Sequence, residues 1–553
     1  MSTTFEDYKR GNASLPTHYR RWHLYGAGLE NVGRNGEPET VETTEPGPDE
    51  ILVRHDACGI CYSDIKIINL GGEHPRLVGR NLAENPVVMG HEVALTVMKV
   101  GENWKDRFHP GERYIVQADI YYNGVNIAYG YALPGGMSQY GLIGPEVLNG
   151  DEGCYLLPLN PDTGYVEAAL VEPWACVEAA YHWTNRDSFR EGGHVLLVGQ
   201  PWDSPVEQQP TTSIGPRYTY TFWNGRGELP VPEKGFDDVV FQGAPEPDVW
   251  EKACAHLAKN AVVCLKSRDG NGLTRPVQVD VGRIHYDGHL FVGSTEDTDN
   301  IQAAYTANRR SELRGSGLCW MIGAAGPMGQ MHLQRALSLP DPPRRILCTD
   351  RHDHRLDTLR ERFAAKAAER GVELILFNVR TQGQPPLETI APEGFDDIVI
   401  MVPSVEAIEE SFPLLAANGV LNVFAGLARG TMAALDMNAV ATKNVRIVGT
   451  SGSTIEDMRV VRDKMESGQL NTGASLAAVG GLNAFREGLE AVKTSRFPGK
   501  TVIFPHLEDL PLTGLDELAK VRPDAAAKLE RGKYWSAEAE QTLLERTKDE
   551  TNG

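Results

Sequence analysis

Residues 319–329 read Cys-Trp-Met-Ile-Gly-Ala-Ala-Gly-Pro-Met-Gly, an apolar run followed by a glycine turn and, from Gln330, the opening of a helix. Glycines allow a backbone to approach a pyrophosphate, and the amino-terminal end of a helix favours negative charge. A second apolar run ends in Asp350, 21 residues after Gly329. An acidic side chain at this distance is typical of sites that bind the ribose of a dinucleotide. The pattern predicts an α/β domain with a doubly wound, mainly parallel Rossmann sheet.

The cofactor expected at this turn is NAD, with NADP less favoured. The Asp350 carboxylate is placed to bind ribose hydroxyls and to repel a 2′-phosphate, although the basic Arg351 and His352 beside it could accept that phosphate. The turn departs from Gly-x-Gly-x-x-Gly, because Ala324 occupies the first glycine position and Gly323 stands one residue earlier. The residues expected to bind the cofactor here are Gly323, Gly326, Pro327, Met328, Gly329, Asp350 and Arg355.

Part of this domain has a counterpart earlier in the chain. Segments beginning at Gly235, Leu257 and Leu290 recur in the same order at Gly394, Leu415 and Arg446, at offsets of 156 to 159 positions. Two unrelated βαβ stretches with common residues are the alternative, but the conserved order and spacing favour a partial duplication.

The earlier copy is not expected to bind a dinucleotide. Its first apolar run, from Val195 to Gly199, is followed by Gln200-Pro-Trp-Asp, with no glycine turn and no helix start. The alternative is a second, degenerate binding site. Residues 200–234 are rich in Pro, Gly, Thr and aromatic residues without a helical period, which predicts a loop or irregular segment.

Three motifs in the β-rich first 190 residues predict a metal site. They are Ala57-Cys-Gly-Ile-Cys-Tyr-Ser-Asp64, then Gly90-His-Glu92, then Val171-Glu-Pro173. Thiolate, imidazole and carboxylate groups suit Zn²⁺, and three protein ligands leave a coordination position open for chemistry. Each motif alone has a simpler interpretation, such as two buried thiols, a turn or a helix start. Their order and spacing together favour the metal.

With these motifs the sequence resembles the zinc-containing medium-chain dehydrogenase/reductase superfamily, on the side of the sorbitol, threonine and sorbose-phosphate dehydrogenases. The resemblance covers about residues 50–200 and 315–505, including Gly135-Gly-Met-Ser-Gln-Tyr140. It implies a GroES-like, β-rich catalytic domain beside the Rossmann domain. It implies a catalytic site built from the zinc ligands Cys61, His91, Glu92 and Glu172, from Ser63 as proton relay and from Asp64 as the partner that orients the histidine. It also implies that Gly449, Thr450 and Ser451 contact the nicotinamide.

Departures from the family pattern refine these expectations. No cysteine lies between His91 and Gly135, so the lobe that binds a structural zinc in many relatives is absent, and we expect one zinc per chain. Leu95 stands where relatives usually have a glycine. Relatives are usually dimers or tetramers, so a homo-oligomer is expected. In them the edge strands of two nucleotide domains pair across a dimer interface, and the partial copy could imitate or cap that edge.

The resemblance gives four expected domains and a reaction. Residues 1–190 form the zinc-binding catalytic domain, 191–314 the partial Rossmann repeat, 315–480 the NAD-binding domain, and 481–553 a return to the catalytic domain with a helical tail. The expected reaction is NAD-linked, zinc-dependent oxidation of a secondary alcohol of a polyol, sugar or sugar phosphate bound between the two main domains. An epimerase or lyase that oxidises its substrate transiently is the alternative. Lys66, Arg76 and Arg80 are candidate contacts for a phosphate.

Composition excludes several other classes of partner. The 553 residues include 54 Lys+Arg and 75 Asp+Glu, a net charge of −21 that argues against nucleic acid or an anionic membrane as partner. No apolar run reaches the roughly 18 to 20 residues of a membrane span. The first residues lack the apolar core of a secretory signal, and the eight cysteines are scattered. We therefore expect a cytoplasmic protein with free thiols.

Overall fold

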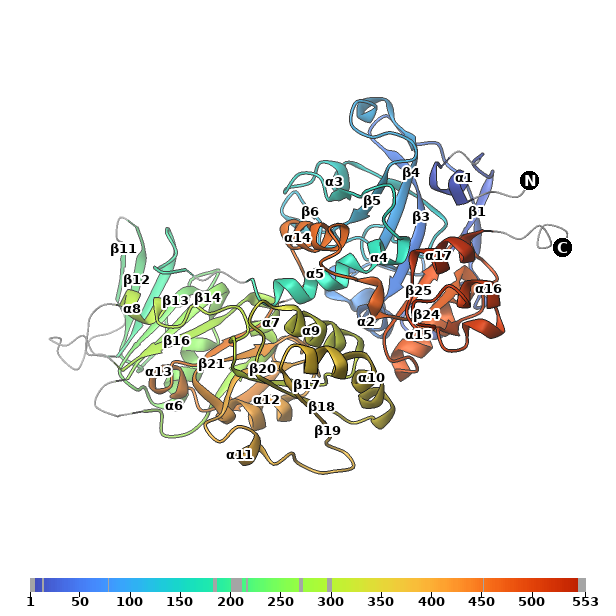
Figure 1. Cartoon of the computed structure of the whole chain (residues 1–553). Helices are drawn as coiled ribbons and strands as arrows, with labels where there is room; N and C mark the ends of the chain where they lie inside the picture. The colour runs from blue at the N-terminus through green and yellow to red at the C-terminus, as the bar shows by residue number, and fades with distance from the viewer. Residues whose placement is uncertain are drawn as a thin grey trace. The chain divides into compact units, whose positions relative to one another are not determined.

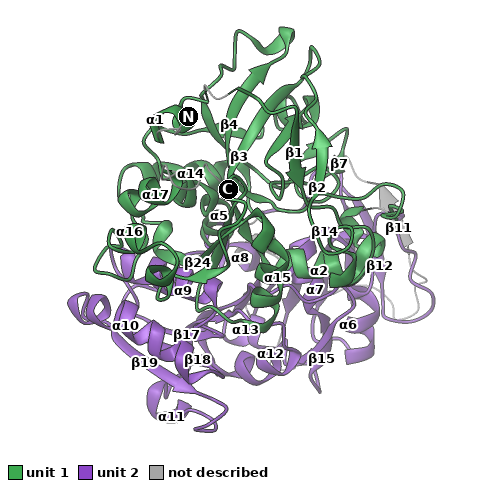
Figure 2. Ribbon diagram, turned by 90° about the vertical axis from the view of Figure 1, so that its right-hand side faces the viewer, with its two compact units in different colours: residues 1–178, 452–553 green, residues 179–451 purple. Residues whose placement is uncertain are grey.

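The computed structural model describes residues 5–11, 14–77, 79–182, 186–199, 211–214, 217–267, 272–295, 301–450 and 452–545. The chain divides into two compact units (Figure 2). Unit 1 comprises residues 1–178 and 452–553, and unit 2 comprises residues 179–451. No helix among the described residues is long and apolar enough to cross a membrane.

Unit 1 is built on an eight-stranded, mainly antiparallel sheet in which strands from both ends of the chain pair. Its order is β26-β24-β25-β3-β4-β5-β9, with β8 also paired to β3. The strands are β3 (Ile51–Ile60), β4 (Glu92–Val100), β5 (Arg113–Val116), β8 (Tyr140–Ile143), β9 (Leu156–Pro158), β24 (Leu476–Gly481), β25 (Lys500–Phe504) and β26 (Thr513–Gly514). All ten residues of β3 are buried, because it lies at the centre of the sheet beneath the apolar core of the unit. This rigid strand leads directly into the metal motif.

Short hairpins and helices complete unit 1. The hairpins are β1 (His18–Arg21) with β2 (Glu39–Glu42), and β6 (Tyr121–Tyr122) with β7 (Val125–Asn126). The helices are α1 (Phe5–Lys9), α2 (Tyr62–Leu70), α3 (Pro145–Leu148), α4 (Tyr165–Ala169), α5 (Val171–Ala179), α14 (Ile455–Glu466), α15 (Phe485–Thr494), α16 (Pro523–Ala526) and α17 (Ala537–Leu544).

Unit 2 contains two six-stranded sheets, which follow one another from β11 to β19 in Figure 1. The first has the order β11-β12-β10-β13-β14-β16 and the second β19-β18-β17-β20-β21-β23. All neighbours are parallel except β11 and β12. The first sheet consists of β10 (His194–Val198), β11 (Thr211–Ile214), β12 (Thr219–Trp223), β13 (Phe236–Gln242), β14 (Leu257–Lys266) and β16 (Leu290–Ser294). The second consists of β17 (Leu318–Ile322), β18 (Arg345–Asp350), β19 (Glu373–Asn378), β20 (Phe395–Ile400), β21 (Leu415–Val423) and β23 (Arg446–Val448).

The crossover helices of unit 2 follow these strands. They are α6 (Pro247–Cys254), α7 (Val281–Asp287), α8 (Ile301–Thr306), α9 (Pro327–Ser338), α10 (Asp353–Glu369), α11 (Leu387–Ile390), α12 (Val405–Ser411) and α13 (Ala439–Thr442). Parallel strands alternating with helices form the Rossmann architecture that the glycine turn predicts, and the fold class is confirmed.

We call residues 186–308 the first half of unit 2 and residues 310–450 the second half. The two halves share more than strand order. The register shifts at the same place in β13 and in β20. Arg186 donates to the Asp238 carboxylate at 2.9 Å, and Arg310, 124 positions later, donates to the Asp397 carboxylate at 2.5 Å. The halves also pair with each other, since β15 (Val277–Asp280) is antiparallel to β22 (Met432–Leu435).

The prediction for residues 200–234 is wrong in part. Residues 200–210 lie outside the described chain, but Thr211–Ile214 and Thr219–Trp223 form β11 and β12. The run Thr219-Tyr-Thr-Phe-Trp consists of β-branched and aromatic residues, which favour a strand, and it pairs in parallel with β10. Along the chain, the strand β11 thus lies between β10 and β12, whereas in the second half the helix α9 lies between β17 and β18.

Candidate active site

The metal motif lies where the buried strand β3 ends and α2 begins. Cys61 has an extended conformation, and its backbone N–H donates to Asp64 Oδ2 at 2.9 Å. This interaction caps the helix and fixes the direction of the Cys61 side chain. Cys61 Sγ lies 3.5 Å from Ser63 Oγ, so the thiol and the hydroxyl face the same space.

His91 is held by the same carboxylate from the neighbouring strand. It immediately precedes β4, after Gly90, whose φ of +100° turns the chain into the strand. Its Nδ1 lies 3.3 Å from Asp64 Oδ1, which leaves Nε2 for a metal. Burial lowers the pKa of His91, but Tyr131 and Asp64 outweigh it, and the net pKa is raised.

Lys500 is a site residue that sequence reasoning missed. It begins β25, and its ammonium forms an ion pair with the Glu92 carboxylate and donates to the Ile60 carbonyl at 3.1 Å. Both side chains of the pair are buried. Burial lowers the pKa of Lys500, but Glu92 and Cys61 raise it further, so the lysine stays charged. In the sequence, the only local sign of this role is a lysine at the start of an apolar strand. Its partner Glu92 lies 408 positions away.

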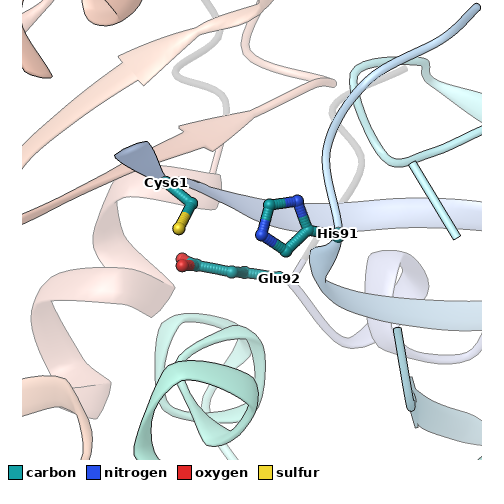
Figure 3. A group of neighbouring side chains, drawn as sticks. All are labelled: Cys61, His91 and Glu92. Carbon is teal, nitrogen blue, oxygen red and sulfur yellow. The ribbon is translucent and has the colours of Figure 1, made fainter. Parts of the chain in front are cut away.

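Cys61, His91 and Glu92 converge in space (Figure 3). One potential ligand atom from each lies within 4.8 Å of the others, and within the described part of the chain no other such group occurs. Glu92 Oε2 is buried without a hydrogen-bond partner, although Lys500 occupies the other oxygen. A buried, unsatisfied carboxylate oxygen beside a thiol and an imidazole fits a bound Zn²⁺.

Glu172 lies near this group but is not one of the three. It stands in the first turn of α5 and is 8% exposed. Burial raises its pKa to about 7, and its carboxylate interacts with the charges of His91, Glu92 and Lys500. Its Oε1 accepts a hydrogen bond from Cys176 Sγ at 3.7 Å.

Tyr131 joins the metal group to a basic loop. Its ring centroid lies 5.5 Å from those of both His91 and His74, and the Arg76 guanidinium lies 5.0 Å above it. Arg76 also forms an ion pair with Asp119 at 2.6 Å. The Tyr131 ring therefore lies between the Arg76 guanidinium and the His91 imidazole of the metal group.

The other two basic candidates differ in their surroundings. Arg80 donates to the Ala132 carbonyl at 2.9 Å and to Asn85 at 2.7 Å, which anchors the loop. Lys66 acts on the charge of His74, whose pKa burial and the two cations Arg76 and Lys66 lower to about 4.

The glycine turn between β17 and α9 is built to bring a phosphate close to backbone. Gly323 has a φ of +81°, so it makes the turn that Ala324 could not. Gly326 caps α9, with Pro327 in the first turn, and a Cβ on Gly326 would meet only the Gly323 carbonyl oxygen, at 3.6 Å. A Cβ on Gly329 would lie 2.4 Å from the Ala324 carbonyl oxygen, so this glycine allows the helix to pack closely on the strand. Met328 is half-buried in the first helical turn.

Asp350 ends β18 beside that turn. It is 8% exposed and accepts hydrogen bonds from the backbone N–H groups of Arg351 at 2.7 Å and of Ala325 at 3.3 Å. His352 Nδ1 lies 3.2 Å from the same carboxylate. Arg355, in α10, is buried close enough for Asp350 to act on its charge, and burial lowers its pKa.

Gly449 and Thr450 follow β23, at the carboxyl edge of the second sheet, whereas Ser451 lies outside the described residues. The Thr450 hydroxyl is buried and has no hydrogen-bond partner in the described structure.

Comparisons with known proteins agree with these features. The family model of the alcohol dehydrogenase GroES-like domain matches residues 47–148. The chain is 25% identical to the mannitol-1-phosphate 5-dehydrogenase of Aliivibrio fischeri, over 92% of this chain and 94% of that protein. It is also 25% identical to the L-sorbose 1-phosphate reductase of Klebsiella pneumoniae, over 93% and 96% of the two chains. Both alignments extend through the first half of unit 2.

Solved structures show the fold. A zinc-binding dehydrogenase from Sinorhizobium meliloti 1021, solved with NADP bound, matches 89% of this chain with a TM-score of 0.51 and 15% sequence identity, and all of that chain is covered.

Proposed function

Since the chain belongs to the zinc-containing medium-chain dehydrogenase/reductase superfamily, we propose that it transfers a hydride between NAD(H) and a secondary alcohol of a polyol, sugar or sugar phosphate. The observation that carries the proposal is the convergence of Cys61, His91 and Glu92 on one point, with a buried Glu92 oxygen left unsatisfied.

The residues of unit 1 would bind the metal and move the proton. Cys61, His91 and Glu92 would hold a zinc ion, with Glu172 as a further carboxylate. A bound zinc ion supplies a Lewis acid that lowers the pKa of an alcohol. Asp64 fixes the orientation of His91, and Ser63, beside Cys61, accepts the alcohol proton and passes it towards solvent.

The residues of unit 2 would bind the cofactor. Gly323 to Gly329 and the amino-terminal end of α9 receive the pyrophosphate. Asp350 accepts hydrogen bonds from the adenosine ribose, which favours NAD over NADP. A nicotinamide cofactor bound there would supply the acceptor or donor of the hydride.

A phosphorylated substrate is the form that two observations favour. The relatives that align over nearly the whole chain are named for mannitol 1-phosphate and L-sorbose 1-phosphate. The Arg76 guanidinium lies over the Tyr131 ring, which contacts His91 of the metal group. From this position Arg76 would pair with a substrate phosphate. We therefore place hexitol and ketose phosphates first among the candidate substrates.

The test combines metal analysis with turnover. The purified chain is expected to contain one zinc per chain and to form NADH with a member of a panel of polyols, sugars and their phosphates. Cys61→Ser is expected to lose zinc and to lower turnover at least about 100-fold. Cys58→Ser is the matched control, because Cys58 is buried in β3 outside the ligand group.

Two outcomes would contradict the proposal in different ways. Absence of zinc from an active chain would remove the metal site. Substrate conversion with retained NAD and no net NADH would instead identify the epimerase or lyase alternative on the same site.

A further inference from the structure

The two halves of unit 2 contact each other as two subunits of a symmetric dimer would. Strand β15 lies between β14 and β16 in the chain, and β22 lies between β21 and β23. These corresponding strands pair antiparallel, with Val277 opposite Leu435 and Asp280 opposite Met432. The edge strands β16 and β23 also pack side by side. Pairing of corresponding elements with each other is the mark of a twofold interface.

The helices that follow these strands cross over to the opposite half. α7 of the first half packs against β14 of its own half and also against β21 and β23 of the second half, whereas α13 of the second half packs against β14 and β16 of the first. A Cβ on Gly449 would lie 3.0 Å from Cα of His285 in α7. A Cβ on Gly293, which has the same position in the first sheet, would lie 2.7 Å from the backbone nitrogen of Ala441 in α13. The two crossed contacts therefore correspond, with His285 on one side and Ala441 on the other.

His285 packs against Gly449 in the second half, which is the half that contains the Gly323–Gly329 turn. The Gly323–Gly329 turn follows β17, and Asp350 ends β18 on one side of it. The rest of a dinucleotide must then extend the other way, over the carboxyl ends of β20 and β21, because the order is β18-β17-β20-β21. At about 4.8 Å per strand, β21 lies about 10 Å from the turn, within reach of the nicotinamide half.

His285 and its neighbour Tyr286 occupy this end of the site. His285 Nδ1 lies 3.1 Å from the carbonyl oxygen of Val423, the last residue of β21, so in the neutral ring Nδ1–H donates and Nε2 is an acceptor. A Cβ on Gly426 would meet the Tyr286 hydroxyl at 2.7 Å and His285 Nε2 at 3.0 Å. The unsatisfied Thr450 hydroxyl follows Gly449 directly.

Tyr286 is held in place from both sides. The Arg429 guanidinium lies 5.1 Å from its ring centroid and forms an ion pair with Asp287 at 2.9 Å. The His285 and Tyr286 rings meet edge to face at 4.6 Å. In the corresponding positions of α13 stand Ala441 and the exposed Thr442, which offer no ring.

From these contacts we propose that the first half, whose sequence after β10 contains no glycine turn, supplies His285 and Tyr286 as part of the binding site for the nicotinamide half of the cofactor held by the second half. This inference rests on the proposed function. One chain would thus complete its own cofactor site across an internal twofold axis, without a second subunit.

The test compares two nucleotides that differ only in the nicotinamide. NAD and ADP-ribose are titrated into the full chain and into a His285→Ala, Tyr286→Ala double variant, with Tyr286→Phe as a milder change. The double variant is expected to bind NAD about tenfold more weakly, equivalent to about 1.4 kcal/mol, while its affinity for ADP-ribose stays within about twofold. Thr442→Ala, at the corresponding position of α13, is the control and is expected to change neither affinity.

The outcomes separate this inference from the proposed function. Equal weakening of both nucleotides, or no weakening of NAD, would overturn the role of His285 and Tyr286 while leaving the dehydrogenase intact. A wild-type chain that binds neither NAD, NADP nor ADP-ribose would overturn the proposed function, and this inference with it.

Discussion

At the scale of the residue, Lys500 sets the charge balance of the metal group. Its ammonium is buried against the Glu92 carboxylate and the Ile60 carbonyl, so Glu92 has a fixed cation beside it that does not depend on a metal. A zinc ion would then share the carboxylate with the lysine, through the oxygen that has no partner. With Lys500 beside it, Glu92 would not become an isolated buried charge if the metal were removed.

Replacing Lys500 by Met is expected to destabilise unit 1 by about 3–5 kcal/mol, because Glu92 would keep a buried charge without its partner. Urea unfolding of the zinc-free chain, in the presence of a chelator, measures the change. The double variant Lys500→Met, Glu92→Gln removes both charges and is expected to recover most of the loss. A single variant as stable as wild type would show that the pair is not formed.

His55 gives a prediction for pH. It is buried in β3, with Nδ1 2.9 Å from the Ser138 carbonyl oxygen and Nε2 2.7 Å from the Tyr129 hydroxyl. Burial lowers its pKa to about 4. Between pH 6.5 and 4 the unfolded chain therefore binds a proton that the folded chain does not, and stability falls as the pH falls.

His55→Gln keeps a donor for Ser138 and an acceptor for Tyr129 but does not titrate. From pH 7 to pH 4.5, the free energy of unfolding of the variant is expected to fall by about 2 kcal/mol less than that of wild type. Thermal unfolding at the two pH values measures this difference. Parallel pH profiles for the two proteins would contradict this account of His55.

At the scale of the element, the carboxyl end of β18 differs from that of β12, its counterpart in the first half. Asp350 ends β18 and receives backbone N–H groups from the turn, while Asn224 follows β12 and accepts from the Arg226 N–H at 3.0 Å. The helix α9 follows the turn in the second half, whereas the next element described after β10 in the first half is the strand β11. The carboxyl end of β18 therefore places Asp350 beside the turn that leads into α9, whereas β12 is followed by the uncharged amide of Asn224.

Asp350→Ser is expected to weaken NAD binding about tenfold and to raise the affinity for NADP relative to NAD, since the charge that repels a 2′-phosphate is gone while Arg351 and His352 remain. Titration with both cofactors measures the ratio. Asn224→Asp is the matched control and is expected to change neither affinity. An unchanged NADP to NAD ratio would place the ribose away from Asp350.

The glycine turn, the metal motifs and the fold class could be predicted from the sequence, because each depends on residues that are close together in the chain. The structure brings Cys61, His91 and Glu92 together through adjacent strands, β3 and β4. Lys500 and His285 could not be predicted in this way, since each reaches its partner through pairing of segments more than 100 positions apart. Strand β12 could have been predicted from its β-branched and aromatic residues, Thr219-Tyr-Thr-Phe-Trp, but its parallel pairing with β10 has no local signal.

At the scale of the whole molecule, close backbone packing fixes the two halves of unit 2 to each other. Gly282, in α7, is the tightest point, because a Cβ there would lie 2.1 Å from the Ala428 carbonyl oxygen. β16 and β23 shield each other's edges within one chain. The predicted homo-oligomer would therefore have to associate through another surface.

Gly282→Val is expected to destabilise unit 2 by about 1–3 kcal/mol, because α7 must move away from the second half. NAD affinity is expected to fall with it, through displacement of His285. Thermal unfolding and NAD titration measure the two effects. Gln278→Thr, on the exposed side of the adjacent strand β15, is the control, and equal behaviour of the two variants would contradict tight packing at Gly282.

The internal twofold removes a constraint that symmetric enzymes carry. In a homodimer whose subunits complete each other's sites, one gene encodes both partners, so every substitution is made twice and must suit both roles. Here His285 packs against Gly449 of the second half, and the matching residue, Ala441, packs against Gly293 of the first half, and the two positions are encoded separately. Each side of the interface is free to diverge by itself, one towards chemistry and the other towards packing alone.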